Sequence, residues 1–295
     1  MKYVVTGSLG HISKPLAEQL IKAGHEVLVA SSKQDKVAQI EAMGAKGAIG
    51  SVEDVAFLTK TFTGVDAVYT MVPPKMDAAD WKGYIQTIGK NFADAVRASG
   101  VKKVVNLSSV GAHMPVGCGP VSGLHHAENE LNALDGVDVK HLRPAYFYYN
   151  LMSNIGMIKH MGIAGGNYGE NATMVMTHPN DIAAAAAEEM NASSFSGKSV
   201  RYIASDERTT TDIAKVLGTA IGKPELPWVN FKNEDTHAGM IQAGLTEEVA
   251  KNYVEMGAAI ASGEMSADYN NNKPALSPTK LEDFAKEFAV AFAHS

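Results

Sequence analysis

The sequence has almost no cysteine and no long apolar run, and each absence excludes a class of protein. Cys118 is the single cysteine among 295 residues, so neither an intrachain disulfide nor a zinc site built from several thiolates can form. No segment approaches the roughly 18 consecutive apolar residues of a membrane span. No charged and apolar leader precedes the first strand-like residues. We therefore expect a cytoplasmic protein that does not associate with membranes.

Basic charge is also scarce. The chain carries 26 Lys and Arg residues against 32 Asp and Glu residues, a formal net charge of −6. A general nucleic-acid binder needs a net basic face, so we expect no nucleic-acid partner. None of the ten histidines stands at a recognisable metal-ligand spacing, so no metal site is expected. A local anion pocket stays open, because net charge says nothing about a single loop.

Short apolar runs alternate with segments of helical periodicity over the first half of the chain. We expect strands at 3–6, 26–30, 47–49, 67–71, 104–107 and 139–142, and helices near 12–23, 34–43, 53–62, 79–98 and 122–134. This alternation predicts βαβ units and a parallel sheet. Near-continuous apolar strands such as 27–30 suit a sheet that is covered on both faces. The fold class is therefore α/β, a Rossmann-type doubly wound parallel sheet.

A glycine loop follows the first strand and opens the first helix, which is where a dinucleotide fingerprint belongs. Gly7 permits the tight turn, and Gly10 lets the backbone approach a pyrophosphate at the helix N-terminus. Ser13 stands where a third glycine often packs the helix against the strand, and serine is small enough for that contact. The loop predicts a dinucleotide site, and the alternative is a glycine turn without a ligand.

The end of the second strand indicates which cofactor is bound. An NAD enzyme usually places Asp or Glu there, about 20 residues after the loop, for the ribose 2′-hydroxyl. Here Ser31, Ser32 and Lys33 end the strand, and the first acid is Asp35. Two hydroxyls and an ammonium group suit a 2′-phosphate, so NADP(H) is favoured over NAD(H). The alternative is a solvated turn with helix-capping serines.

An aromatic run, Tyr146-Phe147-Tyr148-Tyr149, follows the sixth expected strand. Ligands of α/β sheets bind beyond strand ends, and flat rings there suit a planar substrate by stacking. The alternative is ordinary packing of the core and lobe, and Asn150 is either a polar contact or a turn residue. The candidate substrate contacts are Tyr148, Tyr149 and Asn150.

The pattern changes after about residue 145. A glycine-rich polar loop at 162–171 precedes a short strand at 173–176 and an alanine-rich helix at 180–190, which Asn180 or Asp181 can cap. A strand at 200–204, helices at 210–221, 236–243 and 246–262, and an amphipathic helix at 278–293 follow. We assign 1–150 to an NAD(P)-binding Rossmann domain, with 172–205 returning to it. Residues 151–171 and 206–295 then form a smaller, mostly helical substrate-binding lobe with the C-terminal helix.

Several short motifs, taken in order, resemble the NmrA-like family of atypical short-chain dehydrogenases. The likeness is nearest to the branch of type 2 NAD(P)H:quinone oxidoreductases and triphenylmethane reductases, and it spans nearly the whole chain. The motifs are Gly7-x-x-Gly10-x-x-Ser13, Gly64-Val65-Asp66-Ala67-Val68, Leu107-Ser108-Ser109, Leu142-Arg143-Pro144-x-x-Phe147-x-x-Asn150, Asp181-Ile182-Ala183 and Leu281-Glu282-Asp283-Phe284.

The resemblance implies an NADP(H) site with the substrate bound over the nicotinamide by the C-terminal lobe. The pyrophosphate would be held by Gly7, Ser8, Leu9, Gly10, His11 and Ile12, and the 2′-phosphate by Ser31, Ser32 and Lys33. The cofactor cleft would be lined by Met71, Val72 and Pro73. Beside the nicotinamide would lie Ser108 and Ser109, flanked by Pro144, Tyr146 and Phe147.

One departure from the wider superfamily concerns catalysis. Typical short-chain dehydrogenases use a Tyr-x-x-x-Lys pair on the helix after the fifth strand, but here Ser122 and His126 stand at those positions. The His126-x-x-x-Glu130 pattern resembles the quinone-reductase branch instead. His126 could donate a hydrogen bond to the ribose or supply a proton, since its reference pKa is near 6.5. His126 and Ser109 are therefore the candidate catalytic residues, and the alternative is that His126 only orders its helix.

The function expected from these features is an NADPH-dependent reductase that transfers hydride to a quinone, a dye or another small planar acceptor. A non-catalytic NADP(H)-binding redox sensor of the NmrA type is the alternative, because binding needs only the glycine loop. An isomerase or an aromatic-alcohol reductase of the same superfamily stays open, and so does a homodimer.

Overall fold

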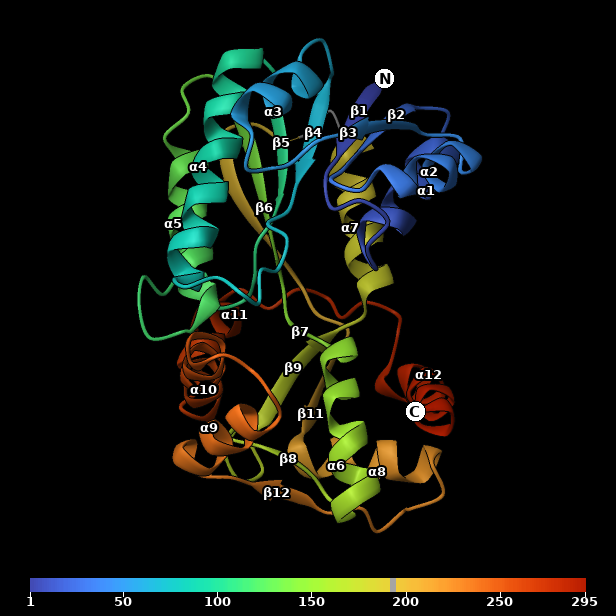
Figure 1. Cartoon of the computed structure of the whole chain (residues 1–295), viewed down its shortest axis with the longest axis vertical. Coiled ribbons are helices and arrows are strands. Elements are labelled where there is room, and N and C mark those ends of the chain that lie inside the picture. Colours follow the sequence, from blue (N-terminus) through green and yellow to red (C-terminus); the bar gives the residue numbers. More distant parts are fainter. Residues whose placement is uncertain (192–194) are drawn as a thin grey trace.

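A seven-stranded parallel sheet organises the first part of the chain in the computed structural model, which describes residues 1–191 and 195–295. The chain runs outward from β1 to β2 and β3, returns to the other side of β1 as β4, and continues outward again (Figure 1). This order confirms the predicted doubly wound Rossmann-type sheet. In spatial order its strands are β10 (Lys198–Ile203), β6 (Asp138–Pro144), β5 (Lys103–Leu107), β4 (Ala67–Thr70), β1 (Lys2–Val5), β2 (Glu26–Ser31) and β3 (Lys46–Ile49).

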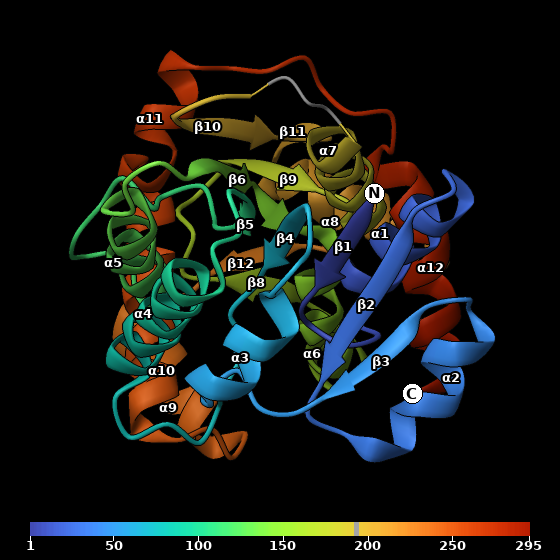
Figure 2. The same cartoon turned by 90° about the horizontal axis from the view of Figure 1, so that it is seen from above.

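Helices cover both faces of this sheet, as Figure 2 shows from above. Leu16 and Leu20 of α1 share one buried cluster with Ile182 of α7, whereas Phe92 of α4 and Leu131 of α5 belong to a second cluster on the other face. Burial on both sides explains why the strands are apolar almost throughout. The covering helices are α1 (Ser13–Lys22), α2 (Val37–Ala42, after the short turn η1, Gln34–Lys36) and α7 (Pro179–Asn191), opposite α3 (Val55–Phe62), α4 (Trp81–Ser99) and α5 (Pro120–Asn132).

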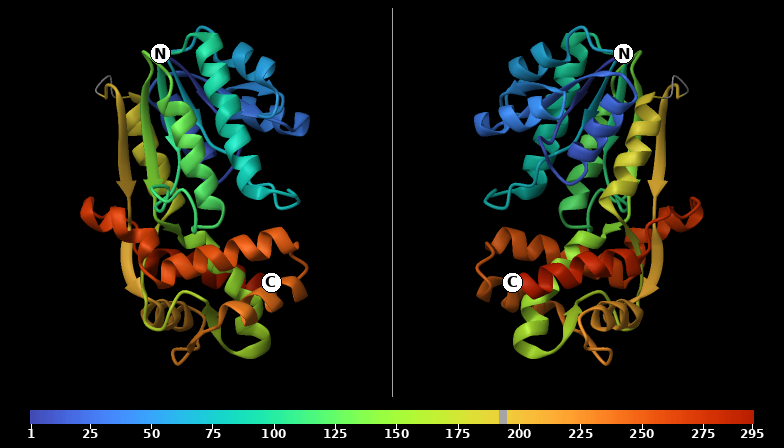
Figure 3. Two further views of the ribbon diagram at one scale, coloured as in Figure 1. Left: turned by 90° about the vertical axis from the view of Figure 1, so that its left-hand side faces the viewer. Right: turned by 90° about the vertical axis from the view of Figure 1, so that its right-hand side faces the viewer.

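A smaller lobe lies beyond the carboxyl ends of the strands, as the side views in Figure 3 show. Its core is the buried cluster around Tyr148, Leu151, Phe284 and Phe288. The lobe holds a three-stranded sheet of β11 (Asp206–Thr209), β9 (Thr173–Thr177) and β7 (Tyr146–Phe147), and a two-stranded sheet of β12 (Trp228–Asn230) and β8 (Ala164–Gly166). Its helices are η2 (Tyr148–Ser153), α6 (Asn154–Met161), α8 (Thr210–Ala220), α9 (Asn233–Gln242), α10 (Glu247–Ala261), η3 (Glu264–Ser266), α11 (Ala267–Asn271) and α12 (Leu281–His294).

The return of the chain to the large sheet differs in part from the expected range 172–205. The strand β9 pairs with β7 and β11, so it belongs to the lobe. Only α7, which packs on α1, and β10, which pairs with β6, rejoin the first domain. Residues 192–194, inside that range, lie outside the described residues. The physical reason is that both edges of β9 are hydrogen-bonded to strands of the lobe, one to β7 and the other to β11.

The cap of α7 also differs from the expectation. The ring Nδ1 of His178 accepts the N–H of Asn180 at 3.1 Å, so neither Asn180 nor Asp181 caps this helix. The Asp181 carboxylate instead accepts hydrogen bonds from the hydroxyls of Ser205 at 2.6 Å and Thr279 at 2.9 Å. A buried carboxylate that joins three segments stabilises the junction between the sheet domain and the lobe.

No helix in the part of the chain that the structure describes is long and apolar enough to cross a membrane.

The close packing of α4 on α5 provides a test of the fold. A Cβ atom at Gly89 would lie 2.5 Å from the Cα of Ala127, so Gly89→Ala should lower the free energy of unfolding by about 1–3 kcal/mol through overpacking. Thermal unfolding followed by circular dichroism measures the loss. The matched control is Gly239→Ala in α9, where a Cβ meets nothing within 4 Å, so its helix propensity should leave the melting temperature equal or higher. Equal melting temperatures for both variants would contradict the packing.

Candidate dinucleotide site

The loop after β1 is tied to the end of β4 at the point where the strand order reverses. The N–H of Thr6 donates to the carbonyl of Tyr69 at 3.0 Å, and the N–H of Met71 donates to the Thr6 hydroxyl at 2.9 Å. Leu9 and Met71 also pack against the same buried cluster as Phe147, which follows β6. The fold therefore brings together residues from three of the predicted segments. Ligands of open α/β sheets bind at this kind of switch point.

The turn at Gly7 has room for no side chain. Its φ is +93°, and a Cβ there would lie 2.5 Å from the Ser13 hydroxyl oxygen and 2.8 Å from Cγ of Met71. Ser13 is buried and donates its hydroxyl to the Thr6 carbonyl at 2.8 Å. The serine at the third fingerprint position thus binds the helix to the strand through a hydrogen bond.

The start of α1 presents free donors, and these fit a pyrophosphate. Within residues 1–191 and 195–295, no hydrogen bond uses the N–H of Leu9, His11 or Ile12. The fully described first turn of α1 holds no acidic residue, and Ile12 provides no side-chain cap. Unpaired N–H groups and the positive end of a helix dipole together form an anion site.

The three residues at the end of β2 divide into two roles. Ser31 is buried, and its hydroxyl accepts hydrogen bonds from the Ser8 hydroxyl at 2.9 Å and the Lys33 N–H at 3.2 Å. Its side chain therefore holds the glycine loop and the following turn together. The side chains of Ser32 and Lys33 are exposed beside it and are available to a ligand.

The ends of β5 and β6 lie side by side. The N–H of Ser108 donates to the Leu142 carbonyl at 2.8 Å, and the N–H of Val110 donates to the Pro144 carbonyl at 2.9 Å. The buried Ser108 hydroxyl has no hydrogen-bond partner within the described chain, whereas that of Ser109 donates to the Val110 carbonyl at 2.8 Å. A buried hydroxyl without a partner is costly, so Ser108 fits a polar group of a bound cofactor.

The three predicted substrate contacts differ in how exposed they are in the structure. Tyr148 is fully buried in the lobe core and stacks on Phe284 with ring centroids 5.5 Å apart, so its proposed contact with a substrate is wrong. The strand–helix turn at β7 directs its ring inward, a direction that the run of aromatics alone could not reveal. Tyr149 is 47% exposed, and its ring lies 4.3 Å from that of His11 in the glycine loop. Asn150 is exposed next to it.

Helix α5 carries Ser122 and His126, the residues at the Tyr-Lys positions. Ser122 is buried, and its hydroxyl accepts the N–H of Cys118 at 3.2 Å. His126 is half-buried, and its ring lies 5.3 Å from that of His125, whose Nδ1 donates to the Ala112 carbonyl at 2.9 Å in the loop after β5. The catalytic role of His126 stays a prediction.

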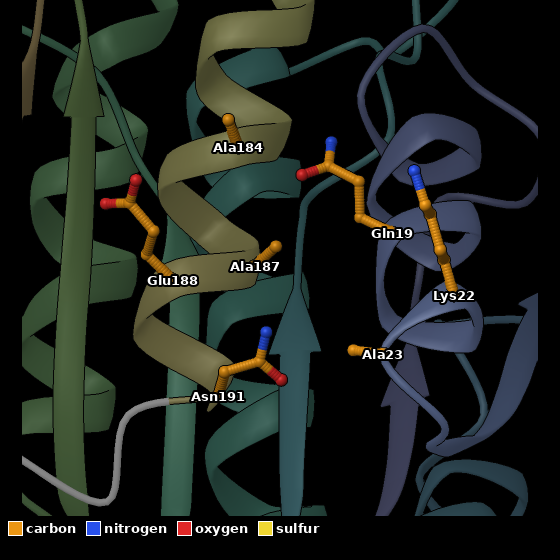
Figure 4. A pocket seen from close by; sticks show the side chains of 7 residues that line it. All are labelled: Gln19, Lys22, Ala23, Ala184, Ala187, Glu188 and Asn191. Carbon is orange, nitrogen blue, oxygen red and sulfur yellow. The ribbon is translucent and has the colours of Figure 1, made fainter.

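A separate groove of about 370 Å³ lies between α1 and α7 (Figure 4). Its walls include Gln19 and Lys22 at the C-terminal end of α1, opposite Ala184 and Glu188 of α7. Because the glycine loop precedes the other end of α1, this groove is not the dinucleotide site. No group of three metal-ligating side chains is present among the residues that the structure describes.

Two aromatic residues, Tyr168 and Tyr253, were not predicted from the sequence: the Tyr168 hydroxyl lies 3.1 Å from that of Tyr146, and Tyr253 packs in the same cluster as Val72. Each stands alone in a polar or helical segment without a motif, and only folding places it near Tyr146. The sequence carries no local signal that could have found them.

The doubly wound sheet, the glycine turn and the free donors at α1 define a dinucleotide-binding protein of the Rossmann type. The model of the NAD(P)H-binding family matches residues 7–192, and the chain belongs to this family.

Comparison with individual proteins agrees with this assignment. The chain is 24% identical to an NAD(P)H azoreductase from Xenophilus azovorans over 293 residues, which cover 98% of this chain and 97% of that protein. An NADPH-dependent quinone oxidoreductase from Escherichia coli has a similar structure, with a TM-score of 0.80 at 21% identity over 97% of this chain and 98% of that one. For the triphenylmethane reductase of Citrobacter sp. the TM-score is 0.81 at 20% identity, over 98% of this chain and 100% of that one. The resemblance expected from the sequence motifs is confirmed.

A substitution that adds one methyl group tests the role of the turn at Gly7. Gly7→Ala should abolish measurable binding of NADPH, because the new Cβ meets Ser13 and Met71 as well as an unfavourable φ. Isothermal titration calorimetry measures the binding. Gly64→Ala is the matched control, with a φ of +72° and open space around its Cβ, so it adds backbone strain without a clash. Unchanged binding by a folded Gly7→Ala variant would show that the loop does not hold the cofactor.

Proposed function

We propose that this protein is an NADPH-dependent reductase that passes a hydride to a quinone-like or other planar electron acceptor. The observation that carries the proposal is the glycine loop at the switch point, whose free N–H groups begin helix α1. When bound, the cofactor supplies the hydride. The residues of this chain bind the cofactor's phosphates and position its nicotinamide beside Ser108, whose hydroxyl has no other partner in the described chain.

Two accessible side chains support NADP(H) over NAD(H). Ser32 and Lys33 are exposed at the end of β2, and the first acidic residue, Asp35, lies in the following turn η1. An ammonium group and a hydroxyl complement a 2′-phosphate, whereas NAD-specific sites place a carboxylate at the ribose. Ser31 contributes by holding this turn against the glycine loop.

The acceptor side is supported by exposed aromatic rings and by the relatives. His11 and Tyr149 pack together where the glycine loop meets the lobe, which offers a flat surface to a planar molecule. The names of the three similar proteins specify azo, quinone and triphenylmethane acceptors. These compounds share conjugated π systems that accept two electrons.

A second function is favoured by one specific observation. Ser122 and His126 stand at the positions of the Tyr-Lys pair, and the buried Ser122 hydroxyl already accepts the Cys118 N–H. A redox sensor that binds NADP(H) and regulates a partner protein needs no proton donor. Such a sensor would bind NADPH and NADP⁺ with different affinities and would not turn over.

A steady-state assay separates these two functions. The reductase should oxidise NADPH, followed by its absorbance in the near ultraviolet, in the presence of benzoquinone, an azo dye or a triphenylmethane dye. The expected turnover is well above that of a Gly7→Ala sample assayed in parallel. If NADPH binds tightly and no acceptor in the panel is reduced, the sensor function holds and the reductase is excluded.

The cofactor preference has its own test. Lys33→Ala should raise the KM for NADPH about tenfold, the equivalent of roughly 1.4 kcal/mol, while the KM for NADH stays nearly constant. Lys60→Ala is the control, since Lys60 is an exposed lysine of α3 and its loss changes the net charge equally. An equal rise for NADPH and NADH would refute the role of Lys33 in binding the 2′-phosphate.

A further inference from the structure

The reduction of a neutral acceptor needs a proton as well as a hydride, and two of the hydroxyls near the predicted site already have other partners. The Ser109 hydroxyl already donates to a backbone carbonyl, and Ser122 accepts from Cys118. Ser108 keeps a free hydroxyl, but an aliphatic hydroxyl is a far weaker acid than a phenol. His126 packs on His125, and the phenols near the strand ends are a second source of a proton.

Two tyrosines of the lobe form a hydrogen-bonded pair close to this edge. Tyr146 follows the end of β6 by two residues, and its hydroxyl oxygen lies 3.1 Å from that of Tyr168, which follows β8. Both side chains are only partly buried. One phenol donates its proton to the oxygen of the other. The accepting phenol still has its own O–H proton, and no described residue accepts a hydrogen bond from it. The pair therefore holds one O–H group that is free for a ligand.

At 3.1 Å either hydroxyl of the pair can be the donor, and the electrostatics favour donation from Tyr146. Burial raises the pKa of both tyrosines, and the hydrogen bond between them raises the pKa of Tyr146 further while it lowers that of Tyr168. This is the pattern of a Tyr146 hydroxyl that donates to Tyr168 and stabilises its phenolate. A neighbouring donor favours proton release from Tyr168, which is the effect that lysine has on tyrosine in the usual Tyr-Lys pair.

A third tyrosine connects the pair to the end of β4. Tyr253 of α10 interacts electrostatically with both Tyr146 and Tyr168. It contributes to the raised pKa of Tyr146, although burial and Tyr168 are larger causes. Its ring lies 5.3 Å from that of Trp81 at the start of α4. Tyr253 also packs in the cluster that contains Val72, one of the residues predicted to line the cofactor site. The phenols thus lie on the side of the lobe that faces the carboxyl edge of the sheet.

We propose that the Tyr146 hydroxyl donates to Tyr168, and that Tyr168 in turn donates the proton that a neutral acceptor takes up together with the hydride. This inference rests on the proposed reductase function and names a catalytic residue for it. For a quinone, a hydride adds two electrons and leaves one negative charge, and the proton of the Tyr168 phenol neutralises that charge to give the hydroquinone. The phenolate then recovers a proton from water, because the side chain is partly exposed.

The charge of the acceptor makes this role testable. A quinone or an azo compound needs one hydride and one proton, but a triphenylmethane dye is a cation, and the hydride alone converts it to the neutral leuco form. A missing proton donor should therefore slow the first two reactions and spare the third. A loss of folding, of cofactor binding or of substrate stacking would slow all three.

The experiment compares Tyr168→Phe with the wild-type protein on benzoquinone and on a cationic triphenylmethane dye, with NADPH as the reductant. We expect kcat with benzoquinone to fall by about 10²-fold, with kcat for the dye and the Kd for NADPH within about twofold of wild type. Tyr146→Phe should cause a smaller loss on benzoquinone alone. The control is Tyr3→Phe, which removes a buried hydroxyl bonded to the Met190 carbonyl, distant from the strand ends.

Each result has a distinct meaning. Wild-type turnover of both acceptors, followed by an equal loss on both in Tyr168→Phe, overturns the proton-donor role and leaves the reductase function standing. Unchanged benzoquinone turnover in Tyr168→Phe overturns it as well. If the wild-type protein reduces neither acceptor, the proposed function fails and the inference fails with it.

Discussion

The turn at Gly7 is the constraint on which the dinucleotide site depends. The backbone must leave a buried strand, pass through a positive φ and begin a helix while it stays in contact with the end of β4. Ser13 and Met71 occupy the space where a side chain at Gly7 would lie. Because those neighbours are themselves held by hydrogen bonds to Thr6, the loop has little freedom to move. Its N–H groups are therefore fixed toward an anion before any ligand arrives.

The lobe is joined to this site through buried polar contacts and continuous strands. β6 leads directly into β7, so the small sheet starts where the large one ends. Asp181 binds Ser205 and Thr279, which holds α7, the turn before β11 and the segment before α12 together. On the other side, Arg143 of β6 pairs with Glu128 of α5 and with Asp268 of α11. These links keep aromatic side chains of the lobe near the strand ends.

Much of the fold could be predicted from local patterns. The strands and helices of the first domain, and the position of the glycine loop between β1 and α1, follow from hydrophobic periodicity and turn residues over short stretches. The cap of α7 was misassigned, because the His178 ring competes with Asn180 and Asp181 only once the preceding strand has placed it. Tyr148 was misassigned because the run 146–149 has no clear period of two, so its alternation could not show which ring is buried.

The sequence by itself determined the class of protein, because a dinucleotide fingerprint is local: the Gly7 turn and the helix start are encoded within consecutive residues. Only the tertiary structure decided which groups are available for chemistry. It buried Tyr148 and brought Tyr168 and Tyr253 toward Tyr146 from segments more than 20 residues apart. The physical reason is that a proton donor depends on contacts across the fold, and those contacts leave no local pattern in the chain.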